Sequence, residues 1–379
     1  MRAPRLDECC NRRFAFPAEE LGAVKSRRPH PRFADLLPRA GEGQTFQRFG
    51  ARHSKHGVHT LTPLRKTLFA AALAAFATPA LALDKIPIVV FGPPSLGALL
   101  QPIIKSRNLD KANDLDIDFQ ERTPDAYAAQ FNSGEFQVGG SAALLTVGLA
   151  DARGVKVSYL FNLFDFWGGV VTSRPDVKTL NDLEGKDIAA ARGTTNYIMF
   201  DWFARQQGVD LSKVSVINTA TPGLIGYALA DRAAAVQLWE PAYTSLLAKK
   251  PDLRSLDLQI RHRWQAFAGS PSLPYLGLAA HQAWIDRNRP LVPKLHATYK
   301  AAADWLVSNP DEAAKVISPK GTAEDHKAIA DLVKANDRLG LNIKWAADIR
   351  KEIGFVYAAG KSTGFLPGDP SPATIFEMK

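Results

Sequence analysis

Four short segments bring hydroxyl, amide and acidic side chains to the start of a predicted helix. They read Gly92-Pro93-Pro94-Ser95, Gly139-Gly140-Ser141, Gly193-Thr194-Thr195-Asn196 and Trp239-Glu240-Pro241. A glycine lets backbone approach a ligand, and the free N–H groups at a helix start attract negative charge. Together the four segments predict one polar ligand site, whose contacts include Ser95, Ser141, Gly193, Thr194, Thr195 and Asn196.

A structural role accounts equally well for any one of these segments. Serine, threonine and asparagine side chains commonly satisfy the unpaired N–H groups of a helix's first turn. Thr194 or Thr195 is therefore a candidate helix cap as well as a candidate ligand contact, and the sequence leaves both roles open. Arg192, directly before this turn, is a candidate counter-ion for an acidic solute.

Aromatic and acidic residues follow two of the predicted strands. In "YLFNLFDFWGG", Phe164, Asp165 and Trp167 lie beyond the strand, and Trp239, followed by Glu240, lies at another strand end directly before a helix. Aromatic rings at such positions can stack on a flat ligand, and carboxylates can meet its donors. Core packing, a hydrophobic staple, a helix cap or an ion pair between lobes explains the same residues.

The sequence does not predict catalysis, a cofactor or a metal site. It contains no G-x-S-x-G, H-E-x-x-H, Walker or strand-associated G-x-G-x-x-G motif. The histidines after residue 82 have no metal-ligand spacing, and both cysteines, Cys9 and Cys10, precede that point. The residues therefore favour binding over chemistry.

The net charge of +9 comes from the N-terminal part of the chain. Of 47 basic and 38 acidic residues, 14 and 6 lie within residues 1–82, which leaves 33 basic against 32 acidic residues. A nearly neutral folded part gives no electrostatic support for nucleic-acid binding, so no nucleic acid is expected as a partner.

A secretory signal peptide is predicted at residues 64–82. Arg65 and Lys66 precede the apolar stretch Thr67–Ala77, and Ala80-Leu81-Ala82 gives a small-x-small cleavage pattern. Cleavage after Ala82 would export the remainder to the periplasm. Residues 1–63, rich in Arg, Pro and His, resemble translated intergenic sequence, and we interpret them as a misassigned or disordered leader.

Short apolar runs alternate with helical patterns from Leu83 onward, which is typical of an α/β protein with mainly parallel strands. We expect two lobes: residues 83–172 begin the first, residues 173–270 form the second, and residues 271–379 return to the first and add C-terminal helices. Two crossings at a hinge would make a clamshell that binds a ligand between the lobes.

Several motifs resemble one family across essentially all of the chain after residue 83. The most specific are "DLEGKDIAAARGTT" and the "LWEP" that follows a strand; "GEFQVGGSAAL" and "GVKVSYLF" support them. They resemble periplasmic substrate-binding proteins of ABC importers of the alkanesulfonate, nitrate, taurine and thiamine-pyrimidine type. One departure is Gln137, where the family usually has aspartate.

The resemblance implies a type II periplasmic-binding fold, no cofactor, and an ABC permease and ATPase as partners. It places Ser141, Gly193-Thr194-Thr195, Trp239 and Glu240 at a ligand cleft. We expect a monomer that carries a small organic anion such as a sulfonate, or a flat heteroaromatic solute such as a pyrimidine. Two alternatives stay open: a pyrimidine-precursor-synthase-like enzyme on the same fold, and a sensor module for a membrane receptor.

Overall fold

A computed structural model describes residues 83–378 of the chain. The predicted leader, residues 1–63, and the predicted signal peptide, residues 64–82, lie outside the described residues. Within the described part, no helix combines the length and the apolar character that crossing a membrane requires.

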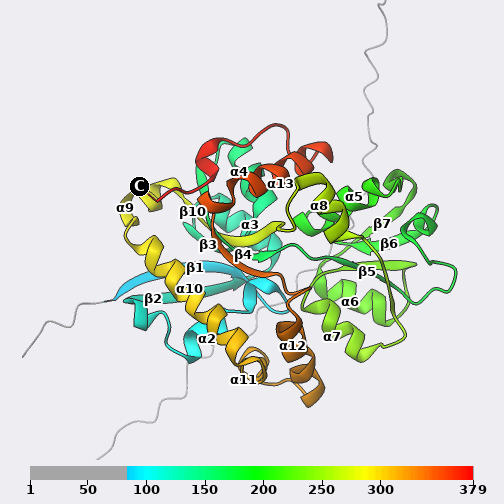
Figure 1. The fold of residues 1–379 in the computed structure, drawn as a ribbon, viewed down its shortest axis with the longest axis horizontal. Helices are drawn as coiled ribbons and strands as arrows, with labels where there is room; N and C mark the ends of the chain where they lie inside the picture. The colour runs from blue at the N-terminus through cyan, green and yellow to red at the C-terminus, as the bar shows by residue number, and fades with distance from the viewer. Residues whose placement is uncertain (1–82, 379) are drawn as a thin grey trace, which may run out of the picture. The chain divides into compact units, whose positions relative to one another are not determined.

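Two β-sheets organise the described residues (Figure 1). Sheet A has the strand order β11-β4-β10-β3-β1-β2, and sheet B has the order β7-β6-β8-β5-β9. The strands of sheet A are β1 (Asp84–Phe91), β2 (Leu115–Arg122), β3 (Val138–Ala143), β4 (Val157–Asp165), β10 (Pro274–His281) and β11 (Leu341–Trp345). The strands of sheet B are β5 (Gly169–Thr172), β6 (Asp187–Ala190), β7 (Ser215–Asn218), β8 (Ala235–Leu238) and β9 (Arg254–Leu256).

Most strands of each sheet run in one direction. In sheet A, β1 is parallel to β2 and β3, whereas β10 is antiparallel to β3 and β4. In sheet B, β6 is parallel to β7 and β8, and β5 is antiparallel to β8. The predicted fold class, an α/β protein with two mainly parallel sheets flanked by helices, is confirmed.

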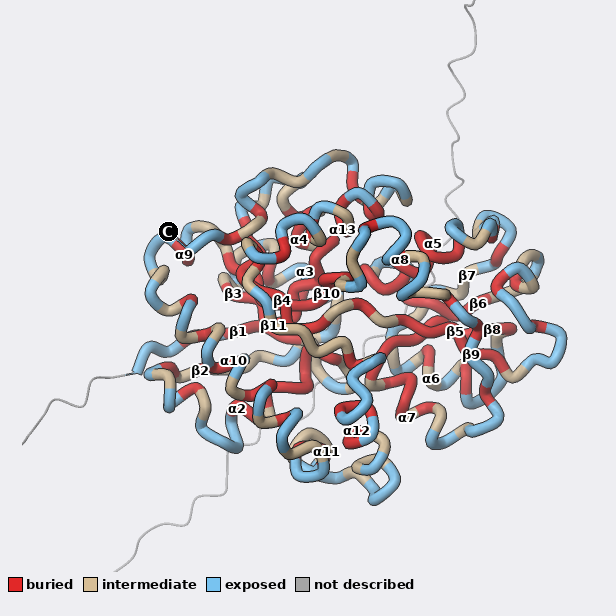
Figure 2. The backbone as a smooth tube through the Cα atoms, viewed as in Figure 1, coloured by how far each residue is buried: buried red, intermediate tan, exposed pale blue. Residues whose placement is uncertain are grey.

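Helices cover both sheets and bury the strands between them. Figure 2 shows buried residues along the strands and exposed residues on the outer sides of the helices. The α-helices are α2 (Gln101–Ser106), α3 (Pro124–Asn132), α4 (Leu144–Ala152), α5 (Thr195–Gln206), α6 (Thr221–Leu229), α7 (Ala242–Lys249), α8 (Ile260–Ala268), α9 (Gln282–Asn288), α10 (Leu291–Ser308), α11 (Pro310–Ile317), α12 (Ala323–Ala335) and α13 (Arg350–Ser362).

The chain passes between the sheets twice, and the two passages lie side by side. The first lies between Asp165 and Gly169, and the second between Leu256 and Pro274. The Phe166 N–H donates to the Leu273 carbonyl at 2.7 Å, which joins the passages directly. The first passage comes earlier than the expected boundary at residue 172. The last residues assigned to the first lobe form β5 (Gly169–Thr172), which pairs with β8 and β9 in sheet B.

Asp165 holds these passages together. Its carboxylate accepts hydrogen bonds from the Ser272 hydroxyl at 3.0 Å, the Leu273 N–H at 3.3 Å and the Asn342 amide at 3.0 Å. It also accepts one from Asn162 at 3.1 Å. Burial raises the pKa of the Asp165 carboxyl, and these four donors act in the opposite direction. One carboxylate thus connects β4, the second passage and β11.

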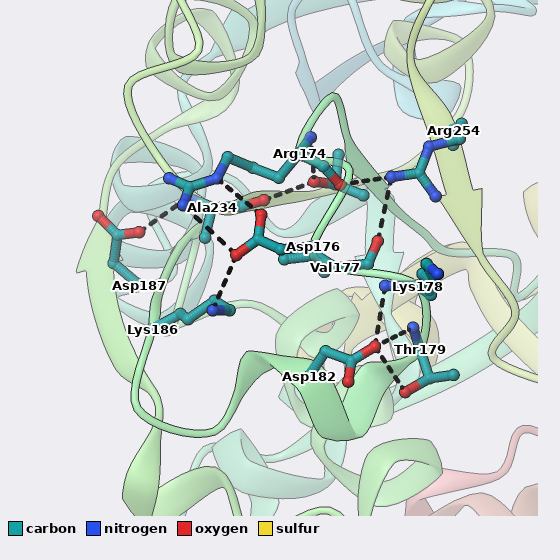
Figure 3. Close-up of polar contacts among 11 residues, drawn as sticks. Arg174, Asp176, Val177, Lys178, Thr179, Asp182, Lys186, Asp187, Ala234 and Arg254 are labelled. Atoms are coloured by element: carbon teal, nitrogen blue, oxygen red, sulfur yellow. Dashed lines mark hydrogen bonds and ion pairs between the residues drawn. The ribbon is translucent and has the colours of Figure 1, made fainter.

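A polar network fixes the connection that leads from β5 into β6 (Figure 3). Asp176 pairs with Arg174 at 3.2 Å and with Lys186 at 3.0 Å. Thr179 and Asp182 form a capping box, in which the Asp182 carboxylate accepts from the Thr179 N–H at 2.8 Å. These contacts order the connection before β6, and the turn that begins α5 follows the other end of that strand.

The turn before α5 contains the helix cap that the sequence allowed. The Thr194 hydroxyl accepts from the Tyr197 N–H at 3.2 Å and donates to the Ala191 carbonyl at 2.8 Å. Its side chain is therefore occupied by its own helix. Thr195 and Asn196, the next two residues, do not serve this role.

We expect Asp165→Asn to lower the free energy of unfolding at pH 7 by about 1–3 kcal/mol, because an amide NH₂ would face groups that already donate. Chemical denaturation measures this loss. Asp304→Asn is the control, because Asp304 makes an exposed pair with Lys300 at 2.6 Å and such pairs contribute little. Equal, small losses in both variants would show that Asp165 does not hold the passages.

Candidate ligand-binding site

A cavity of about 650 Å³ opens between the two sheets. Its size lies within the range of small-molecule sites in proteins. Residues that follow β1, β2 and β3 form one side, and residues that follow β6, β7 and β8 form the other. Six of the twelve residues predicted from the sequence lie in its wall: Ser95, Gly193, Thr194, Thr195, Asn196 and Trp239.

The second-lobe wall is built from the starts of α5 and α6. Thr195 and Asn196 are the first two residues of α5, and both are at least 98% buried. Within residues 83–378, the Thr195 Oγ1 and Asn196 Oδ1 atoms have no hydrogen-bond partner. Thr221 is the first residue of α6, and the N-cap residue before it, Ala220, has no side-chain group that could cap the helix. Two helix starts and two unpaired polar atoms thus line this wall.

Three aromatic rings pack on one another in the first-lobe wall. Phe91 packs edge-to-face on Tyr127 with ring centroids 4.8 Å apart, and Tyr127 stacks on Phe131 at 5.8 Å. All three line the cavity, as does Ser95, whose buried hydroxyl has no partner within the described chain. These rings offer a face on which an apolar or flat part of a ligand can pack.

A hydrogen bond between the lobes crosses the cavity wall. The Asn196 amide nitrogen of α5 donates to the Tyr275 hydroxyl of β10 at 2.5 Å. Tyr275 lines the cavity, and its ring packs edge-to-face on Phe166 at 5.7 Å. Burial raises the pKa of the Tyr275 hydroxyl, so this group stays protonated.

Charged groups lie in the first-lobe wall. Glu121 and Asp125 are exposed carboxylates, and Arg122 lies between them in the sequence. The Arg122 side chain is engaged, because its Nε donates to Gln130 at 2.7 Å and its guanidinium lies over the Phe136 ring. The described residues contain no group of three or more His, Cys, Asp or Glu side chains that could hold a metal ion.

Three other predicted residues have packing roles outside the cavity wall. The Ser141 hydroxyl accepts from the Phe91 N–H at 2.9 Å, which ties β3 to β1. Phe164 is fully buried in the core around sheet A, and Trp167 packs edge-to-face on Tyr243 at 4.7 Å.

Arg192, Asp165 and Glu240 also lie outside the wall. Arg192 is exposed, and its backbone N–H donates to Asn218 at 2.9 Å. Asp165 makes the contacts between passages described above. Glu240 forms an ion pair with Arg338, a residue of the segment between α12 and β11.

The Glu240 pair ties the two lobes together beside Trp239. The fully buried carboxylate accepts from Arg338 Nε at 2.9 Å and from the Thr244 hydroxyl at 2.9 Å. The Arg338 guanidinium also lies over the rings of Trp167, at 6.0 Å, and Tyr243, at 5.7 Å. Burial raises the pKa of Glu240, and the bond from Arg338 opposes that shift.

Several lining residues were not predicted, although the same sequence signal marks most of them. Thr123 follows β2. Asn218 is the last residue of β7, and Thr219 and Thr221 come after it, so these residues also occupy strand-to-helix junctions. Extending the junction rule to every strand would have found them. Tyr275 differs, because it reaches the cavity from the start of β10 and has no local signal.

Comparison with known protein families assigns the chain to one family. A family model described as "NMT1/THI5 like" matches residues 109–313. A search of curated proteins finds no match.

Solved structures share the fold at low sequence identity. The periplasmic aliphatic sulphonate binding protein SsuA from Escherichia coli is 16% identical, covers 76% of this chain and 95% of its own, and has a TM-score of 0.60. The alkanesulfonate-binding protein SsuA from Xanthomonas axonopodis pv. citri, bound to MOPS, is 15% identical with coverages of 78% and 98% and a TM-score of 0.62.

A Candida albicans gene product described as having the generic periplasmic binding protein structural fold is 16% identical, with coverages of 76% and 92% and a TM-score of 0.55. The expected periplasmic-binding fold is confirmed.

We expect Arg338→Met to lower the free energy of unfolding at pH 7 by about 2 kcal/mol, because it leaves the buried Glu240 carboxylate unpaired. The expected loss is smaller than for a fully buried ion pair, because the Arg338 side chain is 35% exposed. The loss should be smaller at pH 4. Without Arg338 the pKa of Glu240 in the folded protein rises further above its value in the unfolded protein. The loss of stability therefore builds up as the pH rises from the unfolded-state pKa through the folded-state pKa.

Two variants complete this test by chemical denaturation. Adding Glu240→Gln to Arg338→Met should recover at least half of the loss, because no buried charge then remains. Lys327→Met is the control, because Lys327 and its partner Asp331 are both exposed. A loss independent of pH and not reduced in the double variant would argue against the ion pair.

Proposed function

We propose the function of this chain from two premises: the chain belongs to the NMT1/THI5-like family, and its cavity joins two lobes at the starts of several helices. On this basis the protein is the periplasmic solute-binding component of an ABC importer. It binds a small organic solute between its lobes and delivers it to a membrane permease that an ATPase drives. The observation that carries this proposal is the cavity with its unpaired, buried Thr195 and Asn196 atoms.

A solute with an anionic head is the ligand class that the second-lobe wall supports best. The N-terminal turns of α5 and α6 both reach the cavity, and their N–H groups and dipoles attract negative charge. A sulfonate or a similar acid suits this wall. The aromatic rings of Phe91, Tyr127 and Phe131 then accept the apolar or flat remainder of the solute, which keeps a heteroaromatic solute as the second candidate.

Binding works by population shift in this proposal. A solute that contacts both walls stabilises the state in which the lobes are closed, and that state is the one the permease recognises. The adjacent passages near Asp165 act as the hinge. The similar structures named above include the periplasmic aliphatic sulphonate binding protein from Escherichia coli, which supports the same compartment for this chain. The predicted signal peptide at residues 64–82 supplies the export route.

We propose binding without turnover. The residues that line the cavity include hydroxyls, amides and two carboxylates, but no histidine or cysteine within residues 83–378. A bound candidate solute should therefore be recovered unchanged after prolonged incubation with the protein. Conversion of the solute would favour the enzyme alternative.

A thermal-shift screen of sulfonates, nitrate, carboxylates and pyrimidines tests the solute class. A solute that binds the folded protein raises the melting temperature by mass action, by an amount that grows with its concentration above Kd. We expect an organic acid with an apolar or aromatic portion to give the largest shift. Absence of a shift with every compound would overturn the proposed ligand class.

We expect Thr195→Val to weaken binding of the best solute from that screen at least tenfold, with little loss of stability. The reason is that the Thr195 hydroxyl has no partner among the described residues, whereas the Thr194 hydroxyl caps α5. Thr194→Val is thus the matched control, and it should cost about 1 kcal/mol of stability. Calorimetric titration measures the affinity for the solute, and chemical denaturation measures the free energy of unfolding. Unchanged affinity in Thr195→Val would show that this turn has a structural role only.

A further inference from the structure

We propose that the cavity selects solutes with a single negative charge and discriminates against dianions of the same shape. The inference rests on the proposed function and narrows its solute class from acids to monoanions. It assigns Glu121 and Asp125 as specificity-determining residues, because they place negative charge in the first-lobe wall of the cavity.

Every charged side chain in the cavity wall comes from one short segment. Among the lining residues within 83–378, the charged ones are Glu121, Arg122 and Asp125, at the junction between β2 and α3. The second-lobe wall consists of hydroxyl, amide, aromatic and apolar residues, and no charged residue joins them in the described part of the chain. The side chains of the wall therefore carry a net negative charge, which lies in the first lobe.

The arginine of this segment already has partners of its own. Arg122 Nε donates to the Gln130 side chain at 2.7 Å, and a second guanidinium nitrogen donates to the Glu121 carbonyl at 2.7 Å. The guanidinium also lies over the Phe136 ring, 5.4 Å from its centroid. Arg192 stands between two lining residues in the sequence but is not itself one of them. The positive potential that an acid head meets must therefore come from the backbone.

Four helices supply this backbone potential, because their N-cap residues line the cavity. These residues are Thr123 before α3, Ala143 before α4, Thr194 before α5 and Ala220 before α6. Each helix start acts as about half an elementary positive charge, so the four together supply about two. The net negative charge of the side chains reduces this to about one positive charge. A monoanion balances that charge, and a dianion exceeds it.

The position of Asp125 directs the acid head toward the second lobe. Asp125 lies in the first turn of α3 and offsets the dipole of that helix, whereas the first turns of α4, α5 and α6 contain no acidic residue. The second-lobe wall also offers the Thr195 hydroxyl, which is 98% buried and has no partner among the described residues. This hydroxyl can donate to an acid oxygen, but it does not compensate a second charge.

A dianion therefore loses the hydration of its second charge without gaining an opposite charge, which is costly. The test is calorimetric titration at pH 8 with three phenyl compounds. Benzenesulfonate and the monomethyl ester of phenylphosphonate each carry one negative charge, and phenylphosphonate carries two. We expect phenylphosphonate to bind at least tenfold more weakly than either monoanion. At pH 5.5, where phenylphosphonate carries one charge, most of this difference from benzenesulfonate should disappear.

Two double variants test the assignment of the carboxylates. Glu121→Gln with Asp125→Asn should lower the ratio of the phenylphosphonate Kd to the benzenesulfonate Kd at least threefold at low ionic strength, where repulsion between charges is least screened. Asp304→Asn with Asp331→Asn changes the net charge equally at exposed residues outside the cavity wall, and should leave the ratio unchanged. Circular dichroism checks that both variants are folded.

The outcomes distinguish this inference from the function on which it rests. Equal Kd values for phenylphosphonate and benzenesulfonate at pH 8 would overturn the charge selectivity while leaving solute binding in place. The same ratio in the wild-type protein and in the variant that lacks both carboxylates would overturn the roles of Glu121 and Asp125. If none of the three compounds binds, the proposed acid-binding site fails, and this inference fails with it.

Discussion

The hydrogen bonds to Asp165 are the constraint on which the two-lobe arrangement depends. This single buried carboxylate accepts from residues of β4, of the second passage and of β11. A charged group in such a place is costly unless donors surround it, and here four donors do. Both passages between the sheets are thereby fixed at one point, and the opposite edges of the two sheets are left to frame a cavity.

The Glu240–Arg338 pair and the Asn196–Tyr275 bond connect the lobes at two further places. The first involves the carboxylate of Glu240, the residue after Trp239, and lies outside the cavity wall, whereas the second lies in that wall. This difference gives the two contacts different consequences. The ion pair contributes to how firmly the lobes are joined away from the cavity, while the amide–hydroxyl bond joins α5 to β10 within the cavity wall.

Periodicity and junction chemistry predicted the class of fold, and half of the predicted site residues lie in the wall of the cavity. Alternating apolar runs and helical patterns indicated two α/β lobes, because strands buried on both faces leave a simple local pattern. Residues at the carboxyl ends of strands reached the cavity where the following helix begins there, as Ser95, Thr195 and Trp239 do. Asp165 and Glu240 could be recognised as important polar residues, but the partners that join them to other segments, Ser272 and Arg338, lie 107 and 98 residues away in the sequence. Tyr275 had no local signal for the same reason.

A crystal structure of the protein with its best-binding organic acid tests the central claim most directly. The account predicts that the solute lies between sheets A and B, with its acid oxygens within hydrogen-bond distance of the N-terminal turns of α5 and α6. It also predicts contact with Thr195 and with the aromatic wall around Tyr127. A solute bound at the outer surface, or one that contacts residues of a single lobe only, would contradict the account.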